Sequence, residues 1–399
     1  MSEDFLHTIW KHQLWDFNNA VTVNHEPVTV FNPGHYNHMD GPDFSHAKIQ
    51  VGHQIWMGHV EIHLKTSDWF KHGHQHDEKY QPVILHVVYE HDMPNEQSIP
   101  VLELKGKIKH TYLKNYHQLV AQHDGLPCQS FINDFDESKW MLWLQRQLVD
   151  RLEQKVTQIA RLHSEMSQDW DRLMFTLVMQ SMGYFYNKES MTMLAHKTPF
   201  KPFRKLTNPE EAYILLSGMA GLDIDDSKMK QWFKHMQACH QLTPLKSQQW
   251  KLKVRPPARP EETLRTVVEL FIVQKRSFQD VKQWWKAFVE EQQLPFNKLG
   301  NITKHKITHL WLNAFLPLLV YYHRIMDTVD QDNYWEFFTR IKPDKNRQLN
   351  NFNCLKNKPL HAAQTQALIH LYRNYCSLKK CLNCPVGLYM LKTVETDDK

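Results

Sequence analysis

The sequence predicts an α+β protein, in which an N-terminal mixed α/β domain is followed by a larger all-helical domain. Two patterns lead to this prediction. Through the first third of the chain, apolar residues alternate with polar ones or form short runs rich in Val and Ile, as in strands. From about Asp136 the apolar residues recur at helical spacing. A chain of 399 residues also has room for two or three domains. We therefore place the domains at residues 1–135 and 136–399.

Short elements follow one another in the N-terminal domain. Phe5, Ile9 and Trp10 have helical spacing and predict a first helix over residues 3–15. Ser67 is a plausible N-cap for a second, short helix through residues 69–80, which Gly73 weakens. The expected strands lie, in order, within residues 21–34, 44–52, 53–64, 82–91 and 99–106. The order is helix, strands, helix, strands, within about 105 residues.

The C-terminal domain reads as a succession of helices. Its first helix carries an apolar stripe from Trp140 through Leu148 to Val156, which we interpret as core packing. A proline-rich, basic segment, KLKVRPPARP at 251–260, should be an extended connector. Further helices are expected at 170–186, 209–218, 261–274, 278–291, 303–326, 334–341 and 362–375.

Composition limits the class of protein. Hydrophobic residues make up 42% and charged residues 23% of the chain, as in a globular protein. No apolar run reaches the roughly 18–20 residues that span a bilayer, and the N-terminus does not resemble a secretory signal. We expect a cytoplasmic protein without a membrane partner. Six cysteines in such a compartment are expected to be reduced or metal-bound rather than paired as disulfides.

Charge is distributed unevenly along the chain. Residues 1–135 carry a net charge of −7 and 17 of the 26 histidines, whereas residues 136–399 carry +12. An acidic, histidine-rich region is typical of a metal site, and a basic region is typical of a surface that binds a polyanion. Drift in surface composition is the alternative explanation.

Two carboxylates of the N-terminal domain are placed unusually for strand residues. Alternation puts Glu61, His63 and Lys65 on one face of their strand, and Asp43 stands at the start of the preceding strand. Neighbouring antiparallel strands lie about 4.8 Å apart, so Asp43 and Glu61 can converge. Two carboxylates and water are ligands that Mg²⁺ or Mn²⁺ prefers. We expect such an ion between them.

This order of elements and carboxylates resembles the PD-(D/E)XK nuclease superfamily. Pro42-Asp43 matches the first half of its motif, and Glu61-Ile62-His63 stands where Glu-x-Lys is expected. The resemblance implies a metal-dependent nuclease that acts on nucleic acid, with DNA as the expected substrate. Its catalytic residues would be Asp43, Glu61, His63 and Lys65. His63 occupies the slot of the lysine, and Lys65 lies on the same face two residues later.

A longer pattern has a second resemblance. The segments GPDF, GHVEIHLKTSDWFKHGHQHD, YQPVILHVVY, KVRPPARPEETLR and NYCSLKKCLNCPVG are similar to an uncharacterised bacterial family of Bacteroidetes-type genomes, which is a domain of unknown function. The resemblance extends through most of the chain. It implies no established activity.

Four further histidines have open roles. His72, His74 and His76 are of a type that binds transition metals, but residues two apart on a helix do not face one another. A loop would be required to gather them, so we favour a solvated or helix-capping cluster. His86, on a Val- and Ile-rich strand, is either a hydrogen-bonded core residue or a partner of the metal ligands.

The cysteines suggest a second metal site. Cys376, Cys381 and Cys384 are spaced so that three thiolates can face one metal centre, and a fourth ligand would complete a Zn²⁺ site or an Fe–S cluster. Cys128 is the first choice for this ligand and Cys354 the second. The alternative is a group of reduced thiols in a helical turn.

The basic connector is the expected nucleic-acid contact. Lys251, Lys253, Arg255 and Arg259 are spaced along it and can follow phosphates, while Trp250 can stack on a base. A solvated charged face is the alternative.

Three functions remain open: a metal-dependent nuclease, a catalytically inactive nucleic-acid-binding or scaffold protein on a degenerate nuclease fold, and a transition-metal hydrolase that uses the histidine cluster.

Overall fold

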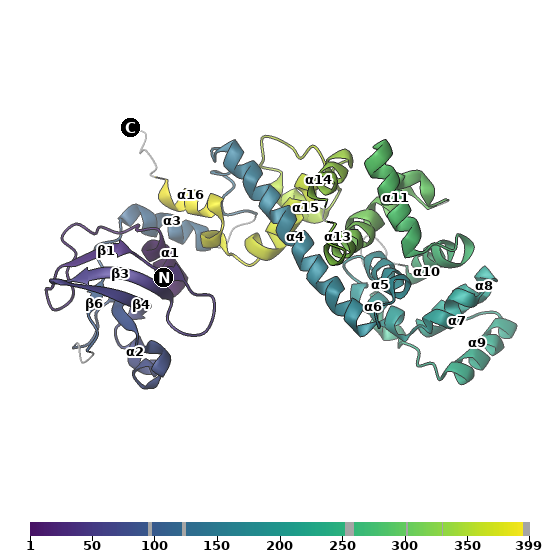
Figure 1. Ribbon diagram of the computed structural model, residues 1–399, viewed down its shortest axis with the longest axis horizontal. Coiled ribbons are helices and arrows are strands. Elements are labelled where there is room, and N and C mark those ends of the chain that lie inside the picture. The colour runs from purple at the N-terminus through teal and green to yellow at the C-terminus, as the bar shows by residue number, and fades with distance from the viewer. Residues whose placement is uncertain (95–97, 122–124, 252–258, 301, 329, 394–399) are drawn as a thin grey trace. The chain divides into compact units, whose positions relative to one another are not determined.

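The computed structural model describes residues 1–94, 98–121, 125–251, 259–300, 302–328 and 330–393 (Figure 1). The chain divides into two compact units. The first comprises Met1–Trp143, Asn346–Lys358 and Leu371–Lys399, and the second comprises Leu144–Lys345 and Pro359–His370. The C-terminal cysteine segment therefore belongs to the same unit as the sheet. The boundary that we expected after residue 135 instead separates the strand-containing part of the sequence from the helical part.

A mixed sheet forms the centre of the first unit. Its strands are β1 (Val28–Asn32), β2 (His35–Tyr36), β3 (Phe44–Val51), β4 (Gln54–Lys65), β5 (Val83–Glu90) and β6 (Val101–Glu103). The order across the sheet is β1-β3-β4-β5-β6, with β2 paired to β3. The β1–β3 and β3–β4 pairs are antiparallel, and the β4–β5 and β5–β6 pairs are parallel.

Helices cover the sheet unequally. Helices α1 (Glu3–Lys11), α3 (His110–Val120) and α16 (Pro385–Lys392) lie on one side of it, and α2 (Asp68–Lys71) lies on the other (Figure 1). Val60, Ile62, Leu85 and Val87 face the first group of helices within one hydrophobic core. Because side chains alternate along a strand, the residues between them, including Glu61, His63 and His86, point to the opposite face.

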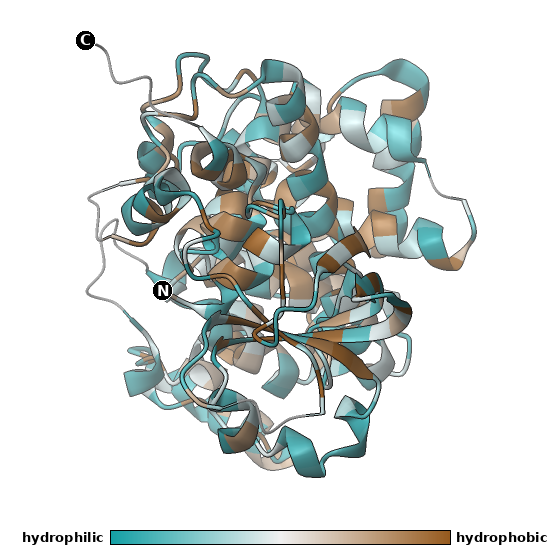
Figure 2. Cartoon of the chain, turned by 90° about the vertical axis from the view of Figure 1, so that its left-hand side faces the viewer, coloured by the Kyte–Doolittle hydropathy of each residue, from teal (hydrophilic) through white to brown (hydrophobic). Residues whose placement is uncertain are grey.

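Burial is most continuous in β5, as its Val- and Ile-rich sequence suggested. Strand β5 is buried along most of its length, as is usual for the Val- and Ile-rich strands of a parallel arrangement. In Figure 2 the strands show the most continuous hydrophobic colour, while the helices alternate between hydrophilic and hydrophobic turns. Helix α16 is fixed to α3 by Asn115, whose side-chain amide donates to the backbone carbonyls of Met390, Leu391 and Thr393.

Two expected helices are shorter than predicted. The first ends at Lys11, and the second consists of α2 alone. After His72, Gly73 adopts a left-handed conformation with φ of 75°, and two 3₁₀ turns follow at His74–His76 and Glu78–Tyr80. A continuous helix through residues 69–80 was therefore a wrong prediction. A left-handed residue stops an α-helix, and glycine adopts this conformation without steric cost.

The second unit is helical in its described residues. Leu148 and Val156 of the predicted apolar stripe are buried on α4, which begins in the first unit. The helices are α4 (Glu137–Glu165), α5 (Trp170–Met182), α6 (Lys188–Lys197), α7 (Phe200–Lys205), α8 (Pro209–Met219), α9 (Ser227–His240), α10 (Pro260–Val268), α11 (Phe278–Glu291), α12 (Lys304–Leu310), α13 (Leu316–Ile325), α14 (Gln331–Arg340) and α15 (Ala362–Leu371). None of the helices in the described part of the chain combines the length and apolarity needed to cross a bilayer.

Candidate metal centre

Asp43 and Glu61 meet at the start of β3. The backbone N–H of Asp43 donates to Glu61 Oε2 at 3.0 Å, and the backbone N–H of Ile62 donates to Asp43 Oδ2 at 2.9 Å. The antiparallel pairing of Phe44 with Val60 sets this register. The structure thus brings together the two carboxylates that the sequence singled out.

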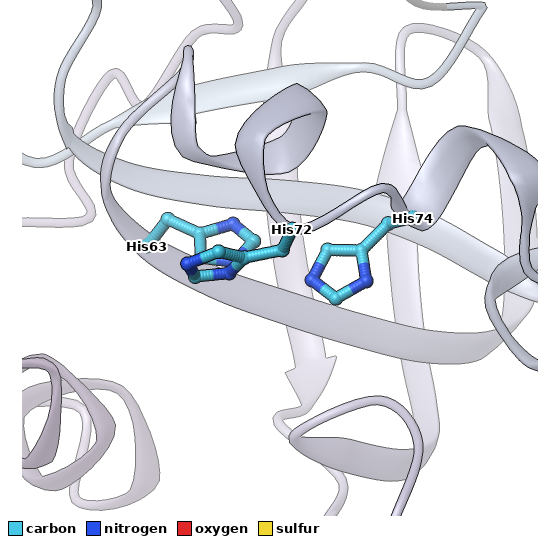
Figure 3. Close-up of side chains that lie close together, drawn as sticks. All are labelled: His63, His72 and His74. Atoms are coloured by element: carbon cyan, nitrogen blue, oxygen red, sulfur yellow. The ribbon is translucent and has the colours of Figure 1, made fainter.

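Three histidines gather beside Glu61. His63 extends from β4, His72 from the end of α2, and His74 from the 3₁₀ turn that follows Gly73 (Figure 3). One ring nitrogen from each lies within 4.8 Å of one from each of the others. His63 Nε2 and His72 Nδ1 are 3.1 Å apart. Glu61 Oε1 lies 3.5 Å from His63 Nε2 and 3.4 Å from His74 Nε2.

Gly73 makes this arrangement possible. In a continuous helix His72 and His74 would point in different directions. The left-handed turn at Gly73 reverses the chain direction, so that both rings face β4. His74 is held in place by Tyr80, against which its ring stacks with 3.8 Å between centroids. His76 is exposed and is not part of the group within 4.8 Å.

The spacing of these atoms suits a single metal ion. Zn²⁺ binds imidazole nitrogen and carboxylate oxygen at about 2.0–2.1 Å, so that neighbouring ligands of a tetrahedral site stand about 3.3–3.4 Å apart. The three separations given above, from 3.1 to 3.5 Å, fall around this value. His63, His72 and His74 are therefore grouped as ligands of one ion would be, and Glu61 Oε1 lies beside two of them.

Partners behind the ligands fix their orientation. His63 Nδ1 lies 2.9 Å from Nε2 of His86, which is fully buried on β5 and pairs in the sheet beside Glu61. A hydrogen bond to the second ring nitrogen selects the tautomer and the ring orientation of a metal-binding histidine. His86 is thus both a buried, hydrogen-bonded residue of its strand and a direct neighbour of the histidine group, so its position agrees with both roles considered for it.

The electrostatics of this face disfavour a carboxylate without a cation. Glu61 is 5% exposed, and burial together with the charge of Asp43 raises its pKa to about 9. Burial lowers the pKa of His63 to about 2, so that its imidazole is neutral. Burial also lowers the pKa of His74. Neutral imidazoles and a proton-bearing carboxyl are groups that a divalent cation would convert into ligands.

His74 also has an unused polar atom. Its Nε2 is buried and makes no hydrogen bond within the described residues, although Glu61 Oε1 is 3.4 Å away. His7 on α1 is similar, because its buried Nε2 lies 3.2 Å from Asp43 Oδ2 without forming a hydrogen bond. Buried polar atoms of this kind usually have a partner in native proteins. Both atoms face the carboxylates.

Lys65 lies outside this group. Its side chain is exposed at the end of β4, where Lys65 pairs with Glu90 of β5 in the sheet. Its backbone N–H donates to the side chain of Asp68. Of the four residues predicted to be catalytic, the structure thus brings together Asp43, Glu61 and His63.

The predicted nucleic-acid contacts are only partly described. Lys253 and Arg255 lie outside the described residues. Lys251 and Arg259 are exposed, and Arg259 is 3.8 Å from Glu262. Trp250 is 6% exposed, and its indole N–H donates to the carbonyl of Ala220. Its interpretation as a base-stacking residue was therefore wrong, because the ring is part of the core.

The predicted cysteine ligands form a separate group in the first unit. Cys128, Cys376, Cys381 and Cys384 are all free thiols that interact with one another electrostatically. Cys354 is near Cys128.

Fold and site together define a protein with two units, in which a mixed α/β sheet carries a cluster of imidazoles and carboxylates and a second unit is helical. The chain belongs to the family described as "Protein of unknown function (DUF2851)", whose model matches residues 3–347. The matched segment includes all the histidines of the cluster. Neither a curated protein nor a solved structure matches the chain.

Sequence reasoning missed two features of the centre. His72 and His74 were visible as a dense histidine pattern, but their convergence depends on the Gly73 turn. This glycine was the available signal, because its presence inside a short helix already weakened the helix prediction. His7 had no comparable signal, since the packing of α1 against the sheet brings it to Asp43.

Proposed function

We propose that this protein is a metal-dependent nuclease, or a related nucleic-acid-processing enzyme, that cleaves phosphodiester bonds. The observation that carries the proposal is the convergence of His63, His72 and His74, with Glu61 Oε1 at 3.4–3.5 Å from two of their ring nitrogens. Asp43 lies directly beside this group. Perturbed carboxyl and imidazole groups on a shared face are frequent at catalytic sites.

The ligand set changes the metal that we propose. Two carboxylates alone favour Mg²⁺ or Mn²⁺, but imidazole favours Zn²⁺, Fe²⁺ and similar ions. With three imidazoles and Glu61, we therefore propose Zn²⁺ or Fe²⁺ ahead of Mg²⁺. When bound, such an ion supplies an activated water and a positive charge for a phosphoryl oxygen.

The protein's own residues would then transfer the proton, orient the ligands and position the ion. Asp43 and His7 form a pair, with 3.2 Å between Oδ2 and Nε2, that can accept the proton of an attacking water. The backbone N–H of Ile62 holds the same Asp43 oxygen in place. His86 would keep Nε2 of His63 directed at the ion. Glu61 would be the ligand that keeps the ion next to Asp43.

Nucleic acid is the proposed substrate for two reasons. Residues 136–399 carry a net charge of +12, and Lys251 and Arg259 of this region are exposed, so that they are available to phosphates. The order α1, three main strands, α2 and β5 also supports the resemblance to the PD-(D/E)XK superfamily. DNA remains the first candidate, as it is for the resemblance.

A second candidate is a nucleic-acid-binding or scaffold protein without catalytic activity. The observation in its favour is that Lys65 is exposed at the end of β4, where it pairs in the sheet with Glu90. His63 stands in the slot of the superfamily's lysine, and its Nδ1 is already engaged by His86.

Cleavage assays distinguish the two candidates. The full-length protein would be stripped of metal, loaded with Zn²⁺, Fe²⁺, Mn²⁺ or Mg²⁺, and incubated with supercoiled DNA, single-stranded DNA and RNA. We expect cleavage with the transition metals, its loss in Glu61→Gln, and its retention in the control His76→Ala. Metal and nucleic-acid binding without cleavage under every condition would contradict the enzyme and support the scaffold.

A further inference from the structure

The first unit contains a second cluster of potential metal ligands, which is independent of the histidine centre. Four cysteines come together in it from separate parts of the chain: Cys128, Cys376, Cys381 and Cys384. Cys376 ends a π-helical turn, Tyr372–Cys376, and Cys381 begins a 3₁₀ turn, Cys381–Asn383. Cys384 caps the N-terminus of α16.

Tight turns bring the three C-terminal thiols together. Lys379 has a left-handed conformation, and the N–H of Lys380 donates to the carbonyl of Tyr375 at 2.9 Å. The N–H of Cys384 donates to the carbonyl of Cys381 at 3.0 Å. Gly387 packs so closely on this turn that an added Cβ would lie 2.1 Å from the carbonyl oxygen of Cys381. The turn thus requires a glycine at position 387.

Cys128 reaches the same place from the end of the sheet domain. Cys128 and Cys381 both pack against the hydrophobic core of the first unit. Two ring contacts, Phe135 with Tyr389 and Trp143 with Tyr375, hold the flanking segments together. The arrangement is therefore supported by packing on both sides of the thiols.

Burial raises the pKa of all four thiols. Neighbouring cysteines add to this rise at Cys128, Cys376 and Cys381. Together these effects raise the pKa of Cys128 to about 12 and that of Cys381 to about 11. At neutral pH these groups are thiols, and a metal centre would bind them with loss of their protons.

Cys384 lies at the N-terminus of α16, close to the indole of Trp143. Burial raises the pKa of Cys384, and the backbone N–H groups of Val386 and Gly387 and the Trp143 indole oppose part of this rise. Trp143 Nε1 is buried and makes no hydrogen bond within the described part of the structure. N–H groups that point at cysteine sulfur are among the contacts that tune metal–sulfur centres.

We propose that Cys128, Cys376, Cys381 and Cys384 bind an iron–sulfur cluster. A single Zn²⁺ would require sulfurs about 3.8 Å apart, given a Zn–S distance of about 2.3 Å. Among the described residues, no three thiol sulfurs lie within 4.8 Å of one another. The cysteine ligands of a cluster bind different iron atoms and stand farther apart, which fits the wider spacing. Binding of the cluster would release the four thiol protons.

Two cysteines serve as controls. Cys354 lies near Cys128, but its thiol interacts mainly with its own turn, with Sγ 4.0 Å from the carbonyl of Asn351. Cys239 is exposed on α9 and contacts His235. Neither Cys239 nor Cys354 is one of the four cysteines that we expect to be ligands.

The test is chemical analysis of the full-length protein purified without oxygen and reconstituted with Fe³⁺, a thiol reductant and sulfide. We expect iron and acid-labile sulfide in about equal amounts, with a visible absorption band that reductant bleaches. Cys128→Ser should lose most of both, and Cys239→Ser and Cys354→Ser should keep them. A protein that binds zinc but no sulfide would overturn the proposal, as would a cluster that Cys128→Ser keeps and Cys354→Ser loses.

Trp143→Phe provides a variant that leaves all four ligands in place. If the indole N–H is directed at the Cys384 sulfur of a bound cluster, its removal should retain the cluster and make its reduction potential more negative. This readout does not depend on whether a cysteine variant folds. An unchanged potential would contradict the placement of Trp143 against the cluster.

Discussion

The buried carboxyl of Glu61 leads to a quantitative prediction about the metal-free protein. Burial and Asp43 raise its pKa from an ordinary value of 4.5 to about 9. Between these two values the folded protein keeps a proton that the unfolded chain loses. The free energy of unfolding should therefore fall as pH rises through this window, by about 1.4 kcal/mol per pH unit.

His63 has the opposite effect at lower pH. Its pKa is lowered from 6.5 to about 2, so that the unfolded chain binds the additional proton below pH 6.5. This contribution to stability rises with pH up to 6.5 and is then complete. Between pH 4.5 and 6.5 the contributions of Glu61 and His63 to the free energy of unfolding change with pH in opposite directions. Between pH 6.5 and about 9 only the contribution of Glu61, of these two, still changes, and it lowers the free energy of unfolding as pH rises.

Glu61→Gln removes the effect of Glu61, because the amide resembles the protonated carboxyl in size and has no charge. Relative to the wild type, the metal-free variant should gain stability as pH rises, by about 3 kcal/mol between pH 6.5 and 8.5. The exposed carboxyl of Glu78, in the same unit, offers a control: Glu78→Gln should not change the difference with pH.

Urea unfolding followed by hydrogen exchange of β4 and β5 peptides measures this difference in the correct unit. The free energy of the variant minus that of the wild type would be compared at the two pH values, after metal has been removed. A difference that does not vary with pH would refute the reasoning, since Glu61 would then be ionised without a cation. Saturating Zn²⁺ should abolish the pH-dependent decline in the wild type.

Three further predictions concern residues around the centre and in the second unit. His86→Leu should reduce Zn²⁺ affinity about 10–100-fold in a chelator competition, because His63 loses the partner that orients it. Gly73→Ala should meet no neighbouring atom but force a left-handed alanine, which costs about 1 kcal/mol and should weaken Zn²⁺ binding in the same assay. Trp250→Ala should lower the free energy of unfolding of the second unit by about 3–5 kcal/mol in urea, as expected for a buried ring.

The positions of the strands, and the face to which each side chain points, could be predicted from the sequence because both depend on neighbouring residues. Val- and Ile-rich runs gave β4 and β5, and the period of two put Glu61 and His63 on one face. The convergence of Asp43 with Glu61 followed from the pairing of adjacent strands. Lys65 shares this face by period, but it lies at the exposed end of the strand, which the period does not reveal.

Longer-range features could not be derived in the same way. The gathering of His72 and His74 depends on one backbone conformation at Gly73, and His7 arrives through the packing of a helix that lies far away in sequence. The association of Cys128 with the C-terminal cysteines was expected from the chemistry of thiols rather than from any local pattern. The turns and packing around these cysteines could be described only from the folded structure.

The most direct test of the account is calorimetric titration of the metal-free, full-length protein with Zn²⁺, in the wild type and in two histidine variants. His74 contributes a ligand in our proposal, and His76, two residues away, is exposed and lies outside the group. We predict that His74→Ala loses one tightly bound equivalent of Zn²⁺ that His76→Ala retains. Equal binding by the wild type and both variants would contradict the metal centre on which the proposed function depends.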